Sequence, residues 1–103
     1  MANYLLLYHG GGMPETDEEK NKLMAAWGEW MKQVGDAMVD LGNPTSNVKT
    51  VDQNGTSEFS GDRVTGYSIV KADDFDKAVE LAKTVPIVDE GGSVDVYETF
   101  RVM

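Results

Sequence analysis

At residues 4–8 the sequence reads Tyr4-Leu5-Leu6-Leu7-Tyr8, an apolar stretch without the alternation of a half-exposed strand. A strand that is apolar on both sides belongs at the centre of a sheet that is covered on both faces. The strand is predicted to run from about Asn3 to His9, where three glycines, Gly10 to Gly12, begin a loop. We therefore expect the rest of the fold to be arranged around this first strand.

His9 is the only histidine among 103 residues. It stands at a strand end beside a loop, a place where functional side chains are common. Two interpretations stay open: His9 is a general acid or base, or it is a polar strand cap that contacts water or a backbone carbonyl. The glycines that follow resemble the oxyanion loop of esterases, but the chain has no G-x-S-x-G segment to carry the nucleophile. The sequence thus argues against an esterase.

Composition limits the classes of partner. Eighteen acidic and nine basic residues give a net charge of −9, which repels nucleic acid and anionic membranes. No apolar run approaches the ~20 residues that cross a bilayer, no leader-like segment precedes Tyr4, and the chain has no cysteine, as in many cytoplasmic proteins. We expect one cytoplasmic globular domain over residues 1–103, without metal or cofactor.

A long first helix is predicted after Pro14. Thr16-Asp17-Glu18-Glu19 is a capping box, in which the Thr16 hydroxyl and the Glu19 carboxylate bond free amides at a helix start. Apolar residues then recur at steps of three and four, and the helix is expected to close at Gly42 and Pro44. The predicted apolar face consists of Leu23, Trp27, Trp30, Val34, Met38 and Leu41. Its two tryptophans could stack a planar ligand, but aromatics at this spacing are usually core.

The middle of the chain predicts two strands and a second helix. Val48 to Asp52 is expected to be a short edge strand, Gln53 to Arg63 a turn or longer hairpin loop, and Val64 to Ala72 the third strand. The second helix has a predicted buried stripe of Phe75, Ala78, Val79, Ala82 and Val85, and it ends at Pro86. The acidic residues before it are Asp73, Asp74 and Asp76. They could bind a cation, but we expect capping instead, by Asp73 together with Asp76.

The last predicted strand, Ser93 to Val102, alternates in polarity. One side carries Val94, Val96, Phe100 and Val102, and the other carries Asp95, Tyr97, Thr99 and Arg101. The order strand-helix-strand-strand-helix-strand predicts an α+β, ferredoxin-like βαββαβ sandwich, with an antiparallel sheet and its first and third strands central. Because both helices cover one face, the polar side of the last strand must meet solvent, a ligand or a second subunit.

Segments along nearly the whole chain resemble the YCII-related family, including its DGPF-type branch. They are Asn3 to Leu7, Leu23 to Trp27, Gly66 to Ile69, Ala72 to Asp74, Ala78 to Lys83, and Pro86 with Gly91 to Val96. The resemblance implies a ferredoxin-like protomer that pairs through its sheet into a dimeric α/β barrel with a cavity between or beside the sheets. A few members resemble enzymes that act on chlorinated muconolactones and use a histidine in the first helix. Here that stretch reads Ala26-Trp27-Gly28-Glu29-Trp30, and the DGPF tetrapeptide is absent.

Two functions from different classes follow. The favoured one is a small homodimeric binding or accessory protein, joined through the sheet face, whose cavity takes a small, anionic metabolite or whose surface meets another protein. The alternative is an enzyme of muconolactone isomerase or dehalogenase type. In that case His9 would move a proton, and Tyr67, Tyr97 or Arg101 would orient the substrate, since a guanidinium suits a carboxylate.

Overall fold

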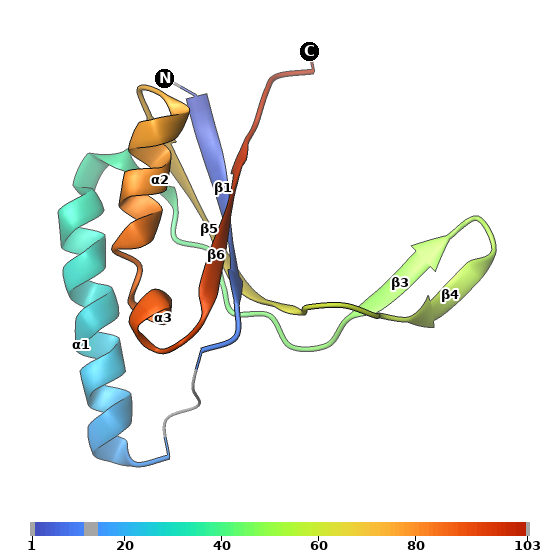
Figure 1. Ribbon diagram of the computed structural model, residues 1–103, viewed down its shortest axis with the longest axis horizontal. Helices are drawn as coiled ribbons and strands as arrows, with labels where there is room; N and C mark the ends of the chain where they lie inside the picture. Colours follow the sequence, from blue (N-terminus) through green and yellow to red (C-terminus); the bar gives the residue numbers. More distant parts are fainter. Residues whose placement is uncertain (1, 12–14, 103) are drawn as a thin grey trace.

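The computed structural model describes residues 2–11 and 15–102, so Gly12 and Pro14 lie outside the described residues. The elements are β1 (Ala2–His9), α1 (Asp17–Val34), the 3₁₀ turn η1 (Gly35–Ala37), β2 (Met38–Asp40), β3 (Lys49–Asp52), β4 (Gly55–Glu58), β5 (Val64–Ala72), α2 (Phe75–Lys83), α3 (Pro86–Asp89) and β6 (Ser93–Glu98). The main sheet has the strand order β2-β5-β1-β6 and is antiparallel. All helices lie on one side of it (Figure 1). The α+β, ferredoxin-like arrangement is confirmed, with β1 and β5, the first and third strands of the main sheet along the chain, at its centre. Within the described ranges, no helix is long and apolar enough to span a membrane.

The side of the sheet that faces the helices forms the core. Alternate residues of β1 point to it, so that Tyr4, Leu6 and Tyr8 are buried. Trp30 of α1 packs on them and is 2% exposed, and its indole N–H donates to the Thr84 hydroxyl at 3.0 Å. Trp30 therefore joins α1 to the end of α2 as well as filling the core.

The start of α1 is confirmed. Thr16 is the N-cap, and its hydroxyl accepts a hydrogen bond from the Glu19 amide at 3.1 Å. The Glu19 carboxylate accepts from the amide of Glu15 at 2.9 Å, one residue earlier than a capping box predicts. The helix start is thus closed by the two side chains that the sequence indicates.

The predicted end of the first helix is wrong. Helix α1 stops at Val34, because Gly35 takes a positive φ of 55° that ends the regular hydrogen bonding. The chain then forms η1 and the strand β2, which pairs with β5 through a bulge. Met38 contacts the core from this strand, and Leu41 follows it at 44% exposure. Met38 and Leu41 therefore continue the helical spacing of α1 by chance, although both lie outside the helix.

The strand predicted at Val48 to Asp52 forms, but it is not an edge of the main sheet. Strand β3 exists, but it pairs only with β4, in a separate two-stranded sheet, and β2 is the edge of the main sheet beside β5. The turn expected within Gln53 to Arg63 is confirmed at Gln53 and Asn54, and the part of that segment interpreted as a longer loop holds β4 itself. We call this β3–β4 hairpin, Lys49–Glu58, the arm. It projects from the sheet on the side away from the helices (Figure 1).

Two smaller expectations also need correction. Helix α2 is capped by Asp74, whose carboxylate accepts from the Lys77 amide at 2.8 Å, and not by Asp73 with Asp76. Strand β6 ends at Glu98, so Phe100 and Val102 do not join a buried face and are 83% and 85% exposed. The last contact with β1 is made by Thr99, whose amide and hydroxyl both donate to the Asn3 carbonyl.

Candidate functional site

A cavity of about 320 Å³ lies on the helix-covered side of the sheet, beside the edge strand β2. We call it the Tyr8 cavity. It is lined by Tyr8, Trp27, Met31, Leu41, Gly42, Asn43, Pro44, Thr65, Gly66, Tyr67, Ser68 and Ile87. None of these described lining residues carries an ionised side chain at neutral pH. The cavity offers aromatic and aliphatic walls with hydroxyl and amide groups, within the ~300–1,000 Å³ range of small-molecule sites.

Aromatic rings form one wall of the Tyr8 cavity. The rings of Tyr8 and Trp27 meet edge to face with centroids 5.4 Å apart, and Trp27 meets Trp30 in the same way at 5.7 Å. Trp30 is buried, whereas Trp27 is half-buried and lines the cavity. The expected core role is thus confirmed for Trp30, whereas Trp27 packs against the core and also lines the cavity.

A chain of two hydroxyls runs behind this wall. The Tyr8 hydroxyl donates to the Ser68 hydroxyl at 2.7 Å, and Ser68 donates to the carbonyl of Leu41 at 2.6 Å. Burial raises the pKa of the Tyr8 phenol above its ordinary value, although the hydrogen bond with Ser68 acts in the opposite direction. Tyr8 therefore stays neutral well above pH 7 and serves as a hydrogen-bonding group rather than as a base.

His9 lies on the opposite face of the sheet from Tyr8, since successive strand residues alternate. Its Nε2 is 2.8 Å from the Asp95 carboxylate, and its Nδ1 is 3.1 Å from the carbonyl oxygen of Arg63. Both partners can only accept hydrogen bonds, so a neutral imidazole satisfies one of them and an imidazolium satisfies both. Each ring nitrogen therefore faces an acceptor, and the ring lies between β1, β6 and the segment before β5.

The glycines beside His9 have a packing role. An added Cβ at Gly92 would lie 2.6 Å from the His9 carbonyl oxygen and 3.0 Å from the amide nitrogen of Gly11. The loop after β1 and the turn before β6 therefore approach each other more closely than side chains allow. A separate open cavity of about 440 Å³ at this corner is lined by His9, Gly10, Gly61, Asp62, Arg63, Thr65, Gly91, Gly92 and Ser93.

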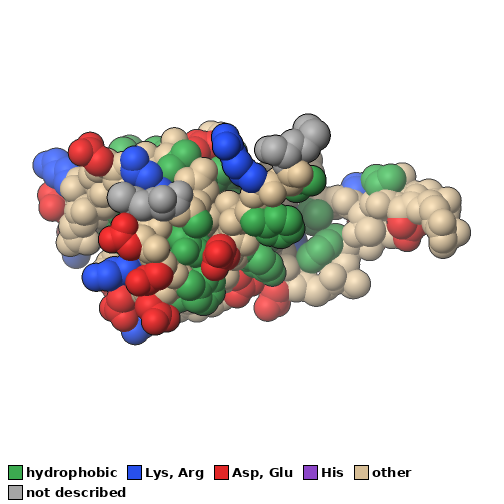
Figure 2. Space-filling model, turned by 90° about the horizontal axis from the view of Figure 1, so that it is seen from above, with side chains coloured by type: hydrophobic (Ala, Val, Ile, Leu, Met, Phe, Trp, Pro, Cys, Tyr) green, Lys and Arg blue, Asp and Glu red, His purple; other side chains and the backbone are tan. Residues whose placement is uncertain are grey.

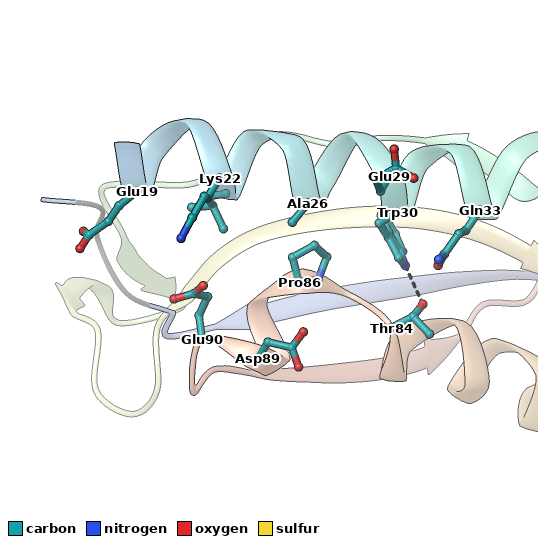
Figure 3. A pocket seen from close by; sticks show the side chains of 11 residues that line it. Glu19, Lys22, Ala26, Glu29, Trp30, Gln33, Thr84, Pro86, Asp89 and Glu90 are labelled. Atoms are coloured by element: carbon teal, nitrogen blue, oxygen red, sulfur yellow. Dashed lines mark hydrogen bonds between the residues drawn. The ribbon is translucent and has the colours of Figure 1, made fainter. Parts of the chain in front are cut away.

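A larger cleft of about 520 Å³ separates α1 from α3 (Figure 3). Glu19, Glu29, Asp89 and Glu90 line it together with a single lysine, Lys22. This charge opposes the anionic metabolite expected from the sequence. The indole N–H of Trp30 is already bonded to Thr84 there, as the dashed line in Figure 3 marks. The cleft is thus a groove between helices in which the four carboxylates outnumber the one lysine, so it disfavours an anion.

The candidate site residues predicted from the sequence do not all lie together in the structure. Tyr67 lines the Tyr8 cavity, but His9, Tyr97 and Arg101 do not. Tyr97 is 53% exposed on the opposite face, and Arg101 lies in the segment after β6. Sequence reasoning missed Tyr8, Ser68 and Asn43 as cavity residues. A serine at an inward position of a buried strand was the available signal, because such a hydroxyl needs a partner.

Comparison with known proteins gives one informative result. No protein-family model matches the chain, and no curated protein sequence matches it. Among solved structures, the fold is similar to that of 5-chloro-2-hydroxyhydroquinone dehydrochlorinase (TftG) from Burkholderia phenoliruptrix AC1100, solved in complex with 2,5-dihydroxybenzoquinone. The match has a TM-score of 0.55 and 18% identity, and covers 96% of this chain and 93% of the other. At this identity the likeness shows that the two chains share a fold.

Proposed function

We propose that the protein binds a small, uncharged, oxygen-substituted ring compound in the Tyr8 cavity. The observation that carries this proposal is the lining: aromatic rings on one wall, hydroxyl and amide groups nearby, and no ionised side chain among the described lining residues. Burying a charge in such a place without a partner costs several kcal/mol, on the order of 3–5. The cavity therefore favours a neutral phenol, hydroquinone or lactone over a carboxylate.

The structural neighbour supports the choice of ring. That protein was solved with a dihydroxylated benzoquinone, a six-membered ring with oxygen substituents. Because the hydroxyls of that ring are vinylogous acids, it supports the ring and its oxygens but not the absence of charge. A ring of this kind can stack against Trp27 and exchange hydrogen bonds with Asn43 or a cavity hydroxyl. Binding is preferred to catalysis because none of the described residues that line the cavity is a carboxylate, an imidazole or an amine that could accept a proton near neutral pH.

A titration with hydroquinone, followed by calorimetry, tests the proposal. Gly66→Ala adds a methyl group that would lie 3.4 Å from the Tyr8 ring and 3.4 Å from the Asn43 carbonyl, inside the cavity. We expect this variant to bind at least tenfold more weakly. Gly28→Ala is the matched control, because its added methyl meets nothing within 4 Å.

Two results would overturn the ring-binding proposal. The first is hydroquinone binding that Gly66→Ala leaves unchanged, because the ligand would then sit elsewhere. The second is benzoate binding that is as tight as hydroquinone binding, because an uncharged cavity disfavours the carboxylate.

A second candidate is an enzyme of muconolactone isomerase or dehalogenase type, and it would use the other face of the sheet. Its support is the His9–Asp95 pair at 2.8 Å, since a carboxylate commonly orients a catalytic imidazole. Removal of HCl from a chlorinated ring needs a base that takes one proton while chloride leaves, and His9 is the only imidazole in the chain. If this candidate is right, His9→Ala lowers turnover by ~100-fold or more with the fold intact. Unchanged turnover would remove His9 from the mechanism.

We also infer a homodimer joined through the open face of the sheet, as in a dimeric α/β barrel. By open face we mean the side without helices, which carries Leu5, Leu7, His9, Ile69, Asp95 and Tyr97. Ile69, Leu5 and Tyr97 lie side by side across β5, β1 and β6. An apolar stripe of this kind across a sheet gains by burial against a second copy. Light scattering that finds only monomer at micromolar concentration would contradict this inference.

A further inference from the structure

The strand residues of the arm are not buried against the rest of the chain. All eight strand residues of β3 and β4 are exposed, and Val51 at 75% exposure presents an apolar side chain to solvent. The two strands pair with each other in regular register from Lys49–Glu58 to Asp52–Gly55. A lone two-stranded hairpin is at best marginally stable in water. An ordered arm of this kind therefore needs something outside the chain to pack against.

The position of the arm indicates where that support lies. In Figure 1 the arm leaves the sheet on the side opposite the helices, and in Figure 2, seen from above, it extends from the body in the same way. Figure 2 shows hydrophobic side chains on the part of the body that lies toward the arm in that view. The arm thus projects at an angle from the sheet, on the side of the open face. A molecule as large as a second copy that covers the open face would lie beside the arm.

The exposed area is large enough for a second copy. The chain exposes 7619 Å², whereas a folded monomer of 11.3 kDa is expected to expose about 5,700 Å². The excess of roughly 1,900 Å² is well above the ~800 Å² that each partner buries in a standard interface. The radius of gyration of 15.2 Å likewise exceeds the ~13 Å of a compact domain of this length.

We propose that the arm is a clasp that lies against a second copy of this chain seated on the open face. The proposal rests on the homodimer inferred above and adds an interface element that the sheet alone does not contain. A two-fold axis would carry each arm onto the other copy, so one apolar contact at Val51 would be made twice. The Lys49 ammonium is 2.7 Å from the Glu58 carboxylate within the same arm, so this pair brings little net charge to the contact.

Charge opposes a second copy less at the arm than elsewhere on the chain. The net charge of −9 repels like chains at long range. The arm, however, holds one lysine against two acidic residues, Asp52 and Glu58, so most of the negative charge lies elsewhere in the chain. Association through the arm and the open face thus brings together the less charged parts of two acidic molecules.

Sedimentation equilibrium of the full chain between 1 and 200 μM (concentrations chosen around the ~μM range of moderate affinities) tests the clasp. Val51→Asp places a carboxylate on the arm, and Val88→Asp places the same charge on α3, where Val88 is 41% exposed on the helix side. We expect Val51→Asp to weaken the dimer at least tenfold and Val88→Asp to change it less than twofold. Val51→Ser, which adds no charge, should weaken the dimer in the same direction.

The outcomes separate the clasp from the dimer. A wild-type dimer that Val51→Asp and Val88→Asp weaken equally would overturn the clasp and leave the open-face dimer standing. A wild-type chain that stays at 11.3 kDa up to 200 μM (weaker than ~10⁻⁴ M, the range of transient contacts) would overturn both. Hydrogen exchange adds a readout that needs no variant: arm amides should become protected as concentration rises, and concentration-independent exchange of those amides would also overturn the clasp.

Discussion

The two faces of the main sheet are made from alternate residues of the same strands, yet only one face is completed by the chain itself. On the helix-covered face, Leu6 is fully buried and Tyr8 is 4% exposed. On the open face, Leu5 and Leu7 are only half-buried and Tyr97 is 53% exposed. One face therefore holds the core and the Tyr8 cavity, and the other holds an apolar stripe that no element of the described chain covers. In the functions proposed above, ligand binding belongs to the first face and assembly to the second.

The largest expected effect comes from truncating neighbouring leucines of β1. Leu6→Ala should lower the free energy of unfolding by about 3 kcal/mol, because it leaves a cavity in the core. Leu7→Ala should cost about 1 kcal/mol in the monomer, since its side chain is already half-exposed. Urea unfolding at a concentration below dimer formation measures both changes. Equal costs would mean that the two faces are equally buried, and would remove the contrast.

The second test separates the faces by pH. Tyr8→Phe should cost about 1 kcal/mol near pH 7 by removing the hydrogen bond to Ser68. Because burial raises the pKa of folded Tyr8, its contribution to stability is complete below the unfolded value of about 10 and is lost as pH rises through the higher folded value. The wild type should therefore lose stability above pH 10 more steeply than Tyr8→Phe.

The Tyr8→Phe variant should still lose some folding stability at alkaline pH, because it retains Tyr4. Burial, followed by the nearby carboxylates of Glu98 and Asp74, also raises the pKa of the Tyr4 phenol. Unfolding curves at pH 8 and at pH above 10 measure the difference between the two proteins. A difference that stays constant across this range would contradict the role given to the buried Tyr8 hydroxyl.

The third test concerns the start of α1, which belongs to neither face of the sheet. Thr16→Ala should lower the free energy of unfolding by about 1 kcal/mol, because the amide of Glu19 loses its acceptor. Thr50→Ala, on the exposed strand β3, is a control for the loss of a threonine hydroxyl. An unchanged urea midpoint for Thr16→Ala would mean that the cap contributes nothing to global stability.

The sequence predicted those parts of the fold that depend on local chemistry. The central position of β1, the bounds of β5 and the Thr16 cap each follow from a few adjacent residues. The end of α1 could not be predicted in the same way. Gly35 competes with a helical pattern that continues through Met38, and only pairing of β2 with β5 decides between them. Strand β3 was misplaced for the same reason, since its partner was chosen by distant contacts.

The candidate site was harder to predict than the fold. His9 drew attention because it is the only imidazole, but the cavity formed on the other side of the same strand, around Tyr8 and Ser68. Neither residue belongs to a sequence motif. Their partnership spans sixty positions and depends on the register between β1 and β5, in which Tyr8 lies opposite Gly66. A single sequence does not contain that register, so residue types alone could not assemble the site.

The smallest expected effect is on the His9–Asp95 pair of the open face. Asp95 is more than half exposed, and exposed ion pairs contribute ~0–1 kcal/mol, so Asp95→Asn should change the free energy of unfolding of the monomer by about 0.5 kcal/mol or less. Hydroquinone binding should not change, because neither residue lines the Tyr8 cavity. Urea unfolding and calorimetry measure the two quantities. A loss of ring binding in Asp95→Asn would show that the faces act together, and the separation of binding from assembly would then be wrong.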